Sequence, residues 1–268
     1  MSPNLVGDLV EVVRERFLRF AQGYLHGADD SFAYTLKIDH TLKVLDVATA
    51  ICQGEGLTGE MALATRLAAL LHDVGRFPQY REYRTFRDRD SVNHAKLSVR
   101  HLLREKLLEG VPAHMRRLVL GAVFLHNARL LPATLPPQLQ QAAKIVRDSD
   151  KLDIMRVMIE HFSLPQSAHP EVSLDAKHHP TNYTREVLAC VMAREVSDYR
   201  RIVWVNDFKL LIVGWLYDLN TATACRLLND TGRMEGILDL LPQDDNILAL
   251  REQIAADLAK RLKGVYLS

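Results

Sequence analysis

LATRLAALLHDVG, residues 63–75, is the stretch that indicates the fold most directly. Its leucines and alanines favour a buried helix, and Gly75 is a typical helix terminator. Two polar residues, His72 and Asp73, stand at the end of this apolar run. Imidazole and carboxylate are common ligands of divalent metals, and a buried carboxylate needs a compensating charge. The stretch predicts a core helix that ends in a metal-binding pair; the alternative is an aspartate that only caps the helix or pairs with Arg76.

Helical spacing of apolar residues recurs along most of the chain, and no segment of useful length alternates with period two. The predicted fold class is therefore all-α, with helices expected at residues 5–24, 34–52, 60–73, 91–109, 112–127, 138–162, 184–197, 202–220, 222–228 and 247–262. Residues 76–90 are expected to be irregular, with Ser91 capping the helix that follows. Residues 163–182 contain three prolines and predict a long loop, which serves either as a lid or as plain surface.

The expected domain organisation is a single domain built from three parts. Residues 1–31 form an N-terminal helix that packs on the bundle, and residues 32–162 form the metal-binding core. Residues 163–268 supply the loop and additional C-terminal helices that complete the same domain.

Composition and charge exclude several classes of protein. The formal net charge is +1, so no global field recruits nucleic acid or an anionic membrane, although local basic groups can still bind a small anionic substrate. The three cysteines are widely spaced without a CxxC motif, which predicts reduced core thiols and a cytoplasmic protein. No signal peptide is expected, because residues 1–25 alternate charged with apolar residues and lack an uninterrupted apolar stretch. No membrane span is expected, because the most apolar stretch, residues 210–219, is shorter than the roughly 20 residues that a bilayer requires.

Four further polar residues occur on otherwise apolar helices: His40, His94, His126 and Asp150. Taken singly, each has an ordinary explanation, such as a hydrogen-bonded core histidine or a histidine at a helix C-terminus. Asp150 is preferred over Asp148 because Ile154 and Val157 follow on its face, whereas Asp148 and Asp153 would be outer partners or solvent-facing. Together with His72 and Asp73, these residues predict a metal site inside a helical bundle.

The order His40, His72-Asp73, His94, His126, Asp150 resembles the HD-domain superfamily over about residues 32–160. The segments LLHDVGRFPQY (70–80) and DSDKLD (148–153) are similar to those of small bacterial HD phosphohydrolase-like proteins. The resemblance implies a helical HD-domain bundle with His40, His72, Asp73 and Asp150 as the minimal metal ligands. His94 and His126 extend the set to two metals, with Asp73 as the bridge. The chain lacks a GYP signature, which argues against a cyclic-dinucleotide substrate.

The resemblance implies a metal-dependent phosphohydrolase, acting on a phosphomonoester or phosphodiester, with a nucleotide among the candidate substrates. Catalytic roles are expected for Asp73, which positions the water, and for Arg76 and Lys151 as phosphate-facing cations; Arg81 and Arg84 are weaker candidates. One or two divalent ions are expected, and sequence does not distinguish Mn, Fe, Ni, Co and Mg. The alternatives are an HD-type di-iron oxygenase and a non-catalytic metal-stabilised sensor. The expected partner is a small phosphorylated molecule, with no membrane and no strong nucleic-acid signal, and a homodimer is left open.

Overall fold

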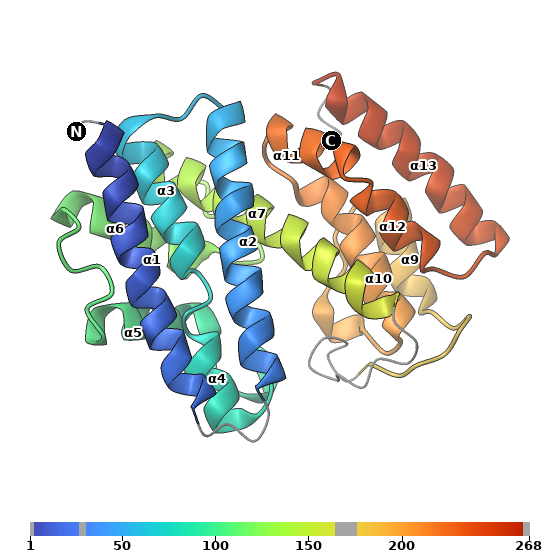
Figure 1. Cartoon of the computed structure of the whole chain (residues 1–268). Helices are drawn as coiled ribbons and strands as arrows, with labels where there is room; N and C mark the ends of the chain where they lie inside the picture. The colour runs from blue at the N-terminus through green and yellow to red at the C-terminus, as the bar shows by residue number, and fades with distance from the viewer. Residues whose placement is uncertain (1–2, 27–30, 164–175, 265–268) are drawn as a thin grey trace. The chain divides into compact units, whose positions relative to one another are not determined.

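Figure 1 shows the computed structural model of the chain, which describes residues 3–26, 31–163 and 176–264. The described residues form helices, with a single isolated bridge between Lys177 and Trp204 in place of a sheet. The predicted all-α class is confirmed. The chain divides into two compact units, residues 1–153 and 154–268. That residues 163–268 complete the same domain as the core stays a prediction.

The first unit contains every residue that the sequence suggested as a metal ligand. Its elements are α1 (Pro3–Leu25), α2 (Phe32–Gly54), α3 (Gly59–Leu71), α4 (Arg76–Tyr83), the short 3₁₀ helix η1 (Asp88–Asp90), α5 (His94–Arg104), α6 (Ala113–Leu125) and the first part of α7 (Pro137–Phe162). The helix α3 contacts α1, α2 and α6, and it is seen between α1 and α2 in Figure 1. Its leucines at 63, 67, 70 and 71 are fully buried, each contributing roughly 1.5–3 kcal/mol. The stretch quoted first is thus the central helix of this unit.

An aromatic cluster holds α4 against the first two helices. The ring of Phe77 lies 5.8–6.2 Å from the rings of Phe17, Phe20, Tyr24 and Tyr34. Aromatic pairs at such separations contribute packing energy beyond the buried area. Because Phe77 follows the His72-Asp73 pair by only four residues, the cluster also fixes the chain just after this pair.

The second unit is a smaller set of helices. It contains α9 (Arg185–Met192), η2 (Tyr199–Arg201), α10 (Val205–Gly214), η3 (Trp215–Asp218), α11 (Ala222–Asp230), α12 (Arg233–Asp239) and α13 (Asp245–Leu262), besides the end of α7. The apolar helix α10 packs on α9 and α12, and α11 packs on α13. Asp207 caps α10 by accepting hydrogen bonds from the backbone of Val203 and Trp204, and from Thr184. No helix within the described ranges is long and apolar enough to cross a membrane.

The expectation of an irregular segment at residues 76–90 was wrong for residues 76–83 and 88–90, whereas residues 84–87 are irregular. Residues 76–83 form α4 and residues 88–90 form η1. Pro78 is compatible with α4 because it lies in the first turn, where a backbone N–H has no helical acceptor. The capping prediction for Ser91 was also wrong: Asn93 caps α5 through the backbone N–H of Lys96.

Three other helix predictions differ from the structure. The helix expected to reach Glu109 ends at Arg104, and Lys106 then takes a positive φ of 51°. The helices expected to begin at Thr184 and Ile202 are shorter, and α12 was not predicted, because seven residues carry too little periodicity to be recognised. Most of the loop expected at residues 163–182, including His169, lies outside the described residues. The prediction that this loop is a lid therefore also lies outside them.

Candidate metal centre

Five helices of the first unit bring the six expected ligands together. His40 lies within α2, His72 is the C-cap of α3 with Asp73 directly after it, and His94 is the first residue of α5. His126 is the C-cap of α6, and Asp150 lies on α7. The four histidines and Asp73 are at most 5% exposed. His72, His94 and His126 are thus brought into the interior at the ends of helices.

Asp73 lies at the middle of the constellation, with different histidines on its two oxygens. Its Oδ2 atom lies 3.8 Å from Nε2 of His40 and 3.7 Å from Nε2 of His72. Its Oδ1 atom lies 3.5 Å from Nε2 of His94 and 3.7 Å from Nε2 of His126. Asp150 completes the first side, because its Oδ1 atom is 3.1 Å from His40 Nε2 and 3.5 Å from His72 Nε2. This is the arrangement expected for a carboxylate shared between two ion positions.

The Nδ1 atom of each ring is already engaged, so each Nε2 faces the centre. His72 donates through Nδ1 to the carbonyl of Ala69, and His126 donates to the carbonyl of Val123, both at 2.7 Å. Because a carbonyl oxygen only accepts, neutral His72 and His126 carry a lone pair on Nε2. Such partners fix the tautomer of metal-binding histidines.

The other two rings are oriented by carboxylates. Nδ1 of His40 lies 2.7 Å from Oδ2 of Asp153. Nδ1 of His94 lies 2.8 Å from both oxygens of Asp88. An ionised carboxylate accepts from the N–H group of the ring, so these two histidines also direct Nε2 inward. Of the two alternatives left open for Asp153, this contact fits the outer partner, and Asp88 holds the same position beside His94.

These donor atoms fit a divalent ion. The Nε2 atoms of His40 and His72 are buried without a hydrogen-bond partner. The Nε2 atoms of His94 and His126 lie 2.9 Å apart, so two lone pairs would face each other if both rings were neutral. Two nitrogens at right angles around one ion, each about 2.1 Å from it, would be about 3.0 Å apart. The sets His40, His72, Asp150 and His72, Asp73, His126 each bring their ligand atoms within 4.8 Å of one another.

The surroundings of the centre favour the protonation states that bind metal, namely ionised aspartates and a neutral His126. Burial raises the pKa of Asp73, but Lys37 and neighbouring histidines outweigh this effect and hold it well below its ordinary value. Burial also raises the pKa of Asp150, but the close rings of His40 and His72 outweigh this effect and hold the pKa well below its ordinary value. Burial lowers the pKa of His126 to about 3. For His40, burial and Lys37 favour the neutral ring, but the neighbouring carboxylates of Asp150 and Asp153 outweigh them and raise its pKa. A proton on His40 would be released when an ion binds.

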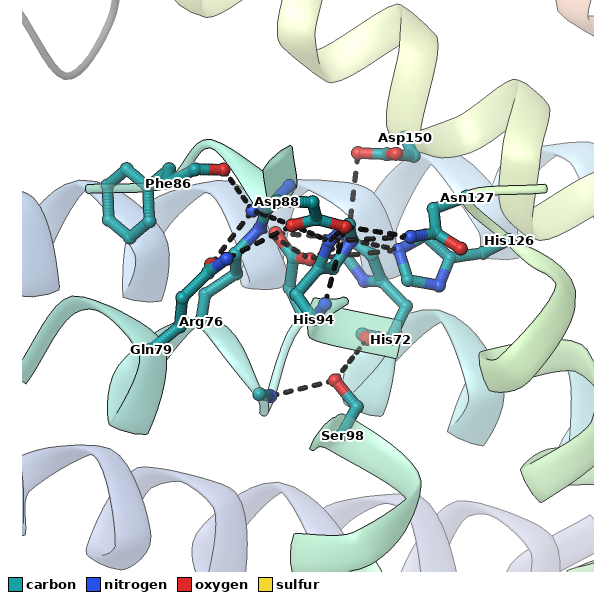
Figure 2. A network of polar contacts seen from close by, with 12 residues as sticks. His72, Arg76, Gln79, Phe86, Asp88, His94, Ser98, His126, Asn127 and Asp150 are labelled. Carbon is teal, nitrogen blue, oxygen red and sulfur yellow. Dashed lines mark hydrogen bonds and ion pairs between the residues drawn. The ribbon is translucent and has the colours of Figure 1, made fainter. Parts of the chain in front are cut away.

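Asp88 joins the centre to the segment after α4. It lies between Arg76 and Gln79 on one side and Asn127 on the other (Figure 2), at 3.1, 3.0 and 3.2 Å from their nitrogens. Burial raises its pKa, but the hydrogen bond from His94 and the nearby positive charges lower it to about 2. Sequence reasoning missed Gln79, which is fully buried and also donates to Ser91 Oγ and to the carbonyl of Val92.

The turn after the His72-Asp73 pair is pressed against α5. Ser98 donates to the carbonyl of His72 at 2.8 Å and accepts from the backbone N–H of Gly75 at 2.7 Å (Figure 2). A Cβ atom on Gly75 would lie 2.3 Å from the carbonyl oxygen of His94. Glycine is therefore required here because two backbone segments that carry ligands approach closely.

The expected cationic residues differ in their placement. Arg76 is fixed by hydrogen bonds to Gln79 Oε1, Asp88 and the carbonyl of Phe86, and its Nε atom lies 3.5 Å from Asp73 Oδ1. Lys151 is buried beside Asp150 on α7. Its catalytic role stays a prediction.

The arginines of the neighbouring segment point elsewhere. The guanidinium of Arg81 lies 4.6 Å from the ring centre of Tyr24, and Arg84 is an exposed residue with positive φ at the end of α4. His101 is buried beside Phe20. Arg81, Arg84 and His101 therefore have structural surroundings of their own.

Sequence reasoning missed Lys37. Its ammonium lies 2.8 Å from Oδ2 of Asp73. The available signal was the spacing of three residues to His40, which places both on one face of α2. A lysine at such a spacing is common on amphipathic helices, so the pattern alone did not single it out.

Comparison with known families gives one match. Residues 38–155 match the family model described as the HD domain, and this segment contains all six expected ligands. No curated protein and no solved structure gives a significant match. The segment 38–155 is therefore an HD domain, the domain that defines the HD-domain superfamily.

Proposed function

We propose that this protein is a metal-dependent phosphohydrolase that cleaves a phosphoester bond of a small phosphorylated substrate with water as the nucleophile. The HD domain supports the general class, because this family consists mostly of metal-dependent hydrolases. The specific support is the position of Asp73. Each of its two oxygens faces two inward-directed imidazole nitrogens, and Asp150 adds a second carboxylate on one side. A closed structural site would need fewer ligands.

In this proposal, the residues around Asp73 have three separate roles: metal binding, orientation of water, and stabilisation of phosphate charge. Divalent ions held by the six ligands would lower the pKa of a water molecule and neutralise charge on phosphoryl oxygens. Asp73 is the carboxylate in reach of both ion positions, so it can orient the attacking water. Arg76, held 3.5 Å from Asp73 by its contacts with Asp88 and Phe86, places a fixed positive charge beside the reacting phosphoryl group.

The side chains around the centre differ in their exposure to solvent. The four histidine side chains are at most 6% exposed, whereas those of Arg76, Asp150 and Asp88 are 16%, 20% and 29% exposed. A substrate would therefore approach with its phosphoryl group past these three residues. A small molecule or a projecting phosphate fits this approach better than a phosphate within a rigid polymer.

The test combines metal analysis with turnover. The protein is purified without added metal, its metal content is measured, and hydrolysis of p-nitrophenyl phosphate and bis-p-nitrophenyl phosphate is assayed with Mn, Fe, Co, Ni or Mg. Asp73→Ala should lose metal and at least about 100-fold in activity while remaining helical. Asp46→Ala, an exposed aspartate on α2, is the matched control and should behave as wild type.

Two results would contradict the proposal. Full phosphatase activity in Asp73→Ala would remove Asp73 from the mechanism. Absence of hydrolysis with every metal, together with substrate turnover that consumes O₂, would instead indicate the di-iron oxygenase class. Running the assays with and without oxygen separates these outcomes.

A further inference from the structure

Lys37 contacts the oxygen of Asp73 that an ion would need. The residue lies on α2, one turn before His40, and its Nζ atom is 2.8 Å from Asp73 Oδ2. The same oxygen faces Nε2 of His40 at 3.8 Å and Nε2 of His72 at 3.7 Å. The ammonium and an ion held by these two histidines would therefore compete for one carboxylate oxygen.

The two cations beside Asp73 differ in how firmly they are held. Arg76 is fixed by Gln79, Asp88 and the carbonyl of Phe86, so an ion near Asp73 Oδ1 would leave it in place. Lys37 carries a compact charge at the end of four rotatable bonds and can swing away from Asp73 without disturbing the backbone. Lys37 is thus the cation that an incoming ion would displace.

A displaced ammonium would remain close to the reaction. The side chain of Lys37 is only 16% exposed, and its Nζ atom lies 5.2 Å from the ring centre of Phe86. The guanidinium carbon of Arg76 lies 5.9 Å from the same ring centre. Once an ion is bound to Oδ2 of Asp73, the largely buried ammonium of Lys37 needs another anionic partner. A phosphoryl oxygen entering beside Arg76 would supply this partner.

We propose that Lys37 is the exchangeable cation of this centre: it neutralises Asp73 while no ion is bound, releases Oδ2 to the ion, and then contacts the phosphoryl group of the substrate. The proposal rests on the proposed function, and it adds a substrate-binding residue that also governs metal affinity. Lys37 makes no covalent bond and transfers no proton in this role.

The experiment compares Lys37→Met with Lys43→Met, which removes a half-exposed lysine from the same helix. Affinity for Mn²⁺ and Co²⁺ is measured by competition with a chelator, and unfolding temperature is measured with and without metal. Lys37→Met should bind the first ion at least about tenfold more tightly, since a positive charge next to a ligand oxygen is removed. The metal-free variant should melt below wild type, because buried Asp73 loses the nearer of its two counter-charges and keeps only Arg76.

The second arm uses inorganic phosphate as the probe. Binding of phosphate to the metal-loaded protein should weaken at least about tenfold in Lys37→Met and be unchanged in Lys43→Met. Lys37→Gln provides the same comparison if the methionine variant does not fold. Unchanged or weaker metal affinity would overturn the proposal, as would unchanged phosphate binding. If the wild-type protein binds no divalent ion, the proposed function fails as well; if it binds and hydrolyses while Lys37→Met matches Lys43→Met, only the role of Lys37 fails.

Discussion

Replacement of Asp88 by asparagine tests whether the outer carboxylates control the second ion position. Both oxygens of Asp88 lie 2.8 Å from His94 Nδ1, and its pKa of about 2 means that the side chain is ionised at neutral pH. Asp88→Asn keeps the shape but removes the charge that fixes the ring of His94. It also places an amide among the nitrogens of Arg76, Gln79 and Asn127, which all approach Asp88 as donors.

The expected loss is confined to one of the two ion positions. Removing an outer partner of a metal-bound histidine typically costs about 10–100-fold in metal affinity, which corresponds to about 1.4–2.7 kcal/mol. The position formed by His40, His72 and Asp150 does not involve Asp88 and should keep its affinity within about twofold. Calorimetric titration with Mn²⁺ should therefore show a weakened second binding step and an unchanged first step.

Asp90→Asn is the matched control for this experiment. Asp90 belongs to the same 3₁₀ helix as Asp88, is half-exposed, and pairs with Arg87 at 3.0 Å. Its replacement should leave both binding steps as in wild type. Identical titrations for Asp88→Asn and Asp90→Asn would refute the idea that the His94 position depends on its carboxylate partner.

Three further predictions concern the packing, the metal and the pH dependence of the centre. Gly75→Ala should destabilise the protein by at least about 2 kcal/mol in urea titration and reduce metal binding, because the new Cβ would lie within 2.5 Å of backbone atoms of α5. Gly23→Ala is the control and should cause neither effect, because the space around Gly23 is open. Removal of metal by a chelator should lower the melting temperature reversibly, since ions that bind only the folded state stabilise it; an unchanged melting curve would argue against ion binding. The metal-free protein should lose stability as pH falls from about 6.5 towards 3, because His126 stays neutral in the folded protein while it takes up a proton in the unfolded chain. His126→Gln should reduce the dependence of stability on pH in this range, and an unchanged dependence would contradict the low pKa of His126.

The sequence allowed the six candidate ligands to be predicted because each lies on or beside an apolar helix. The structure brings all of them together around Asp73, and the contacts from His72 to Ala69 and from His126 to Val123 are local, three residues apart. The partner of His40 could not be deduced in this way, since Asp153 is 113 positions away. Local patterns reveal candidate ligands, whereas the groups that orient them depend on the tertiary fold.

The prediction failed where polar residues form the interior. The segment 76–90 was expected to be irregular because it is polar and aromatic, but its polar groups satisfy one another around buried Gln79. Lys37 was overlooked for the same reason, as its partner Asp73 lies on another helix. Hydrophobic periodicity cannot detect a buried polar network, because it measures only which residues avoid water.

The position of Asp73 explains why a helix end can supply two adjacent ligands. Consecutive residues within a helix diverge by about 100°, which would separate the side chains of His72 and Asp73. Here α3 ends at Leu71, and the turn that follows is held by the bond from Arg76 N–H to the carbonyl of Asp73 and by Ser98 against Gly75. Although His72 keeps helical dihedral angles, Nε2 of His72 and Oδ2 of Asp73 lie 3.7 Å apart in this turn. The pair therefore depends on α5 for its geometry, so a substitution at Ser98 that disturbs this turn should weaken metal binding even though Ser98 contacts no ion.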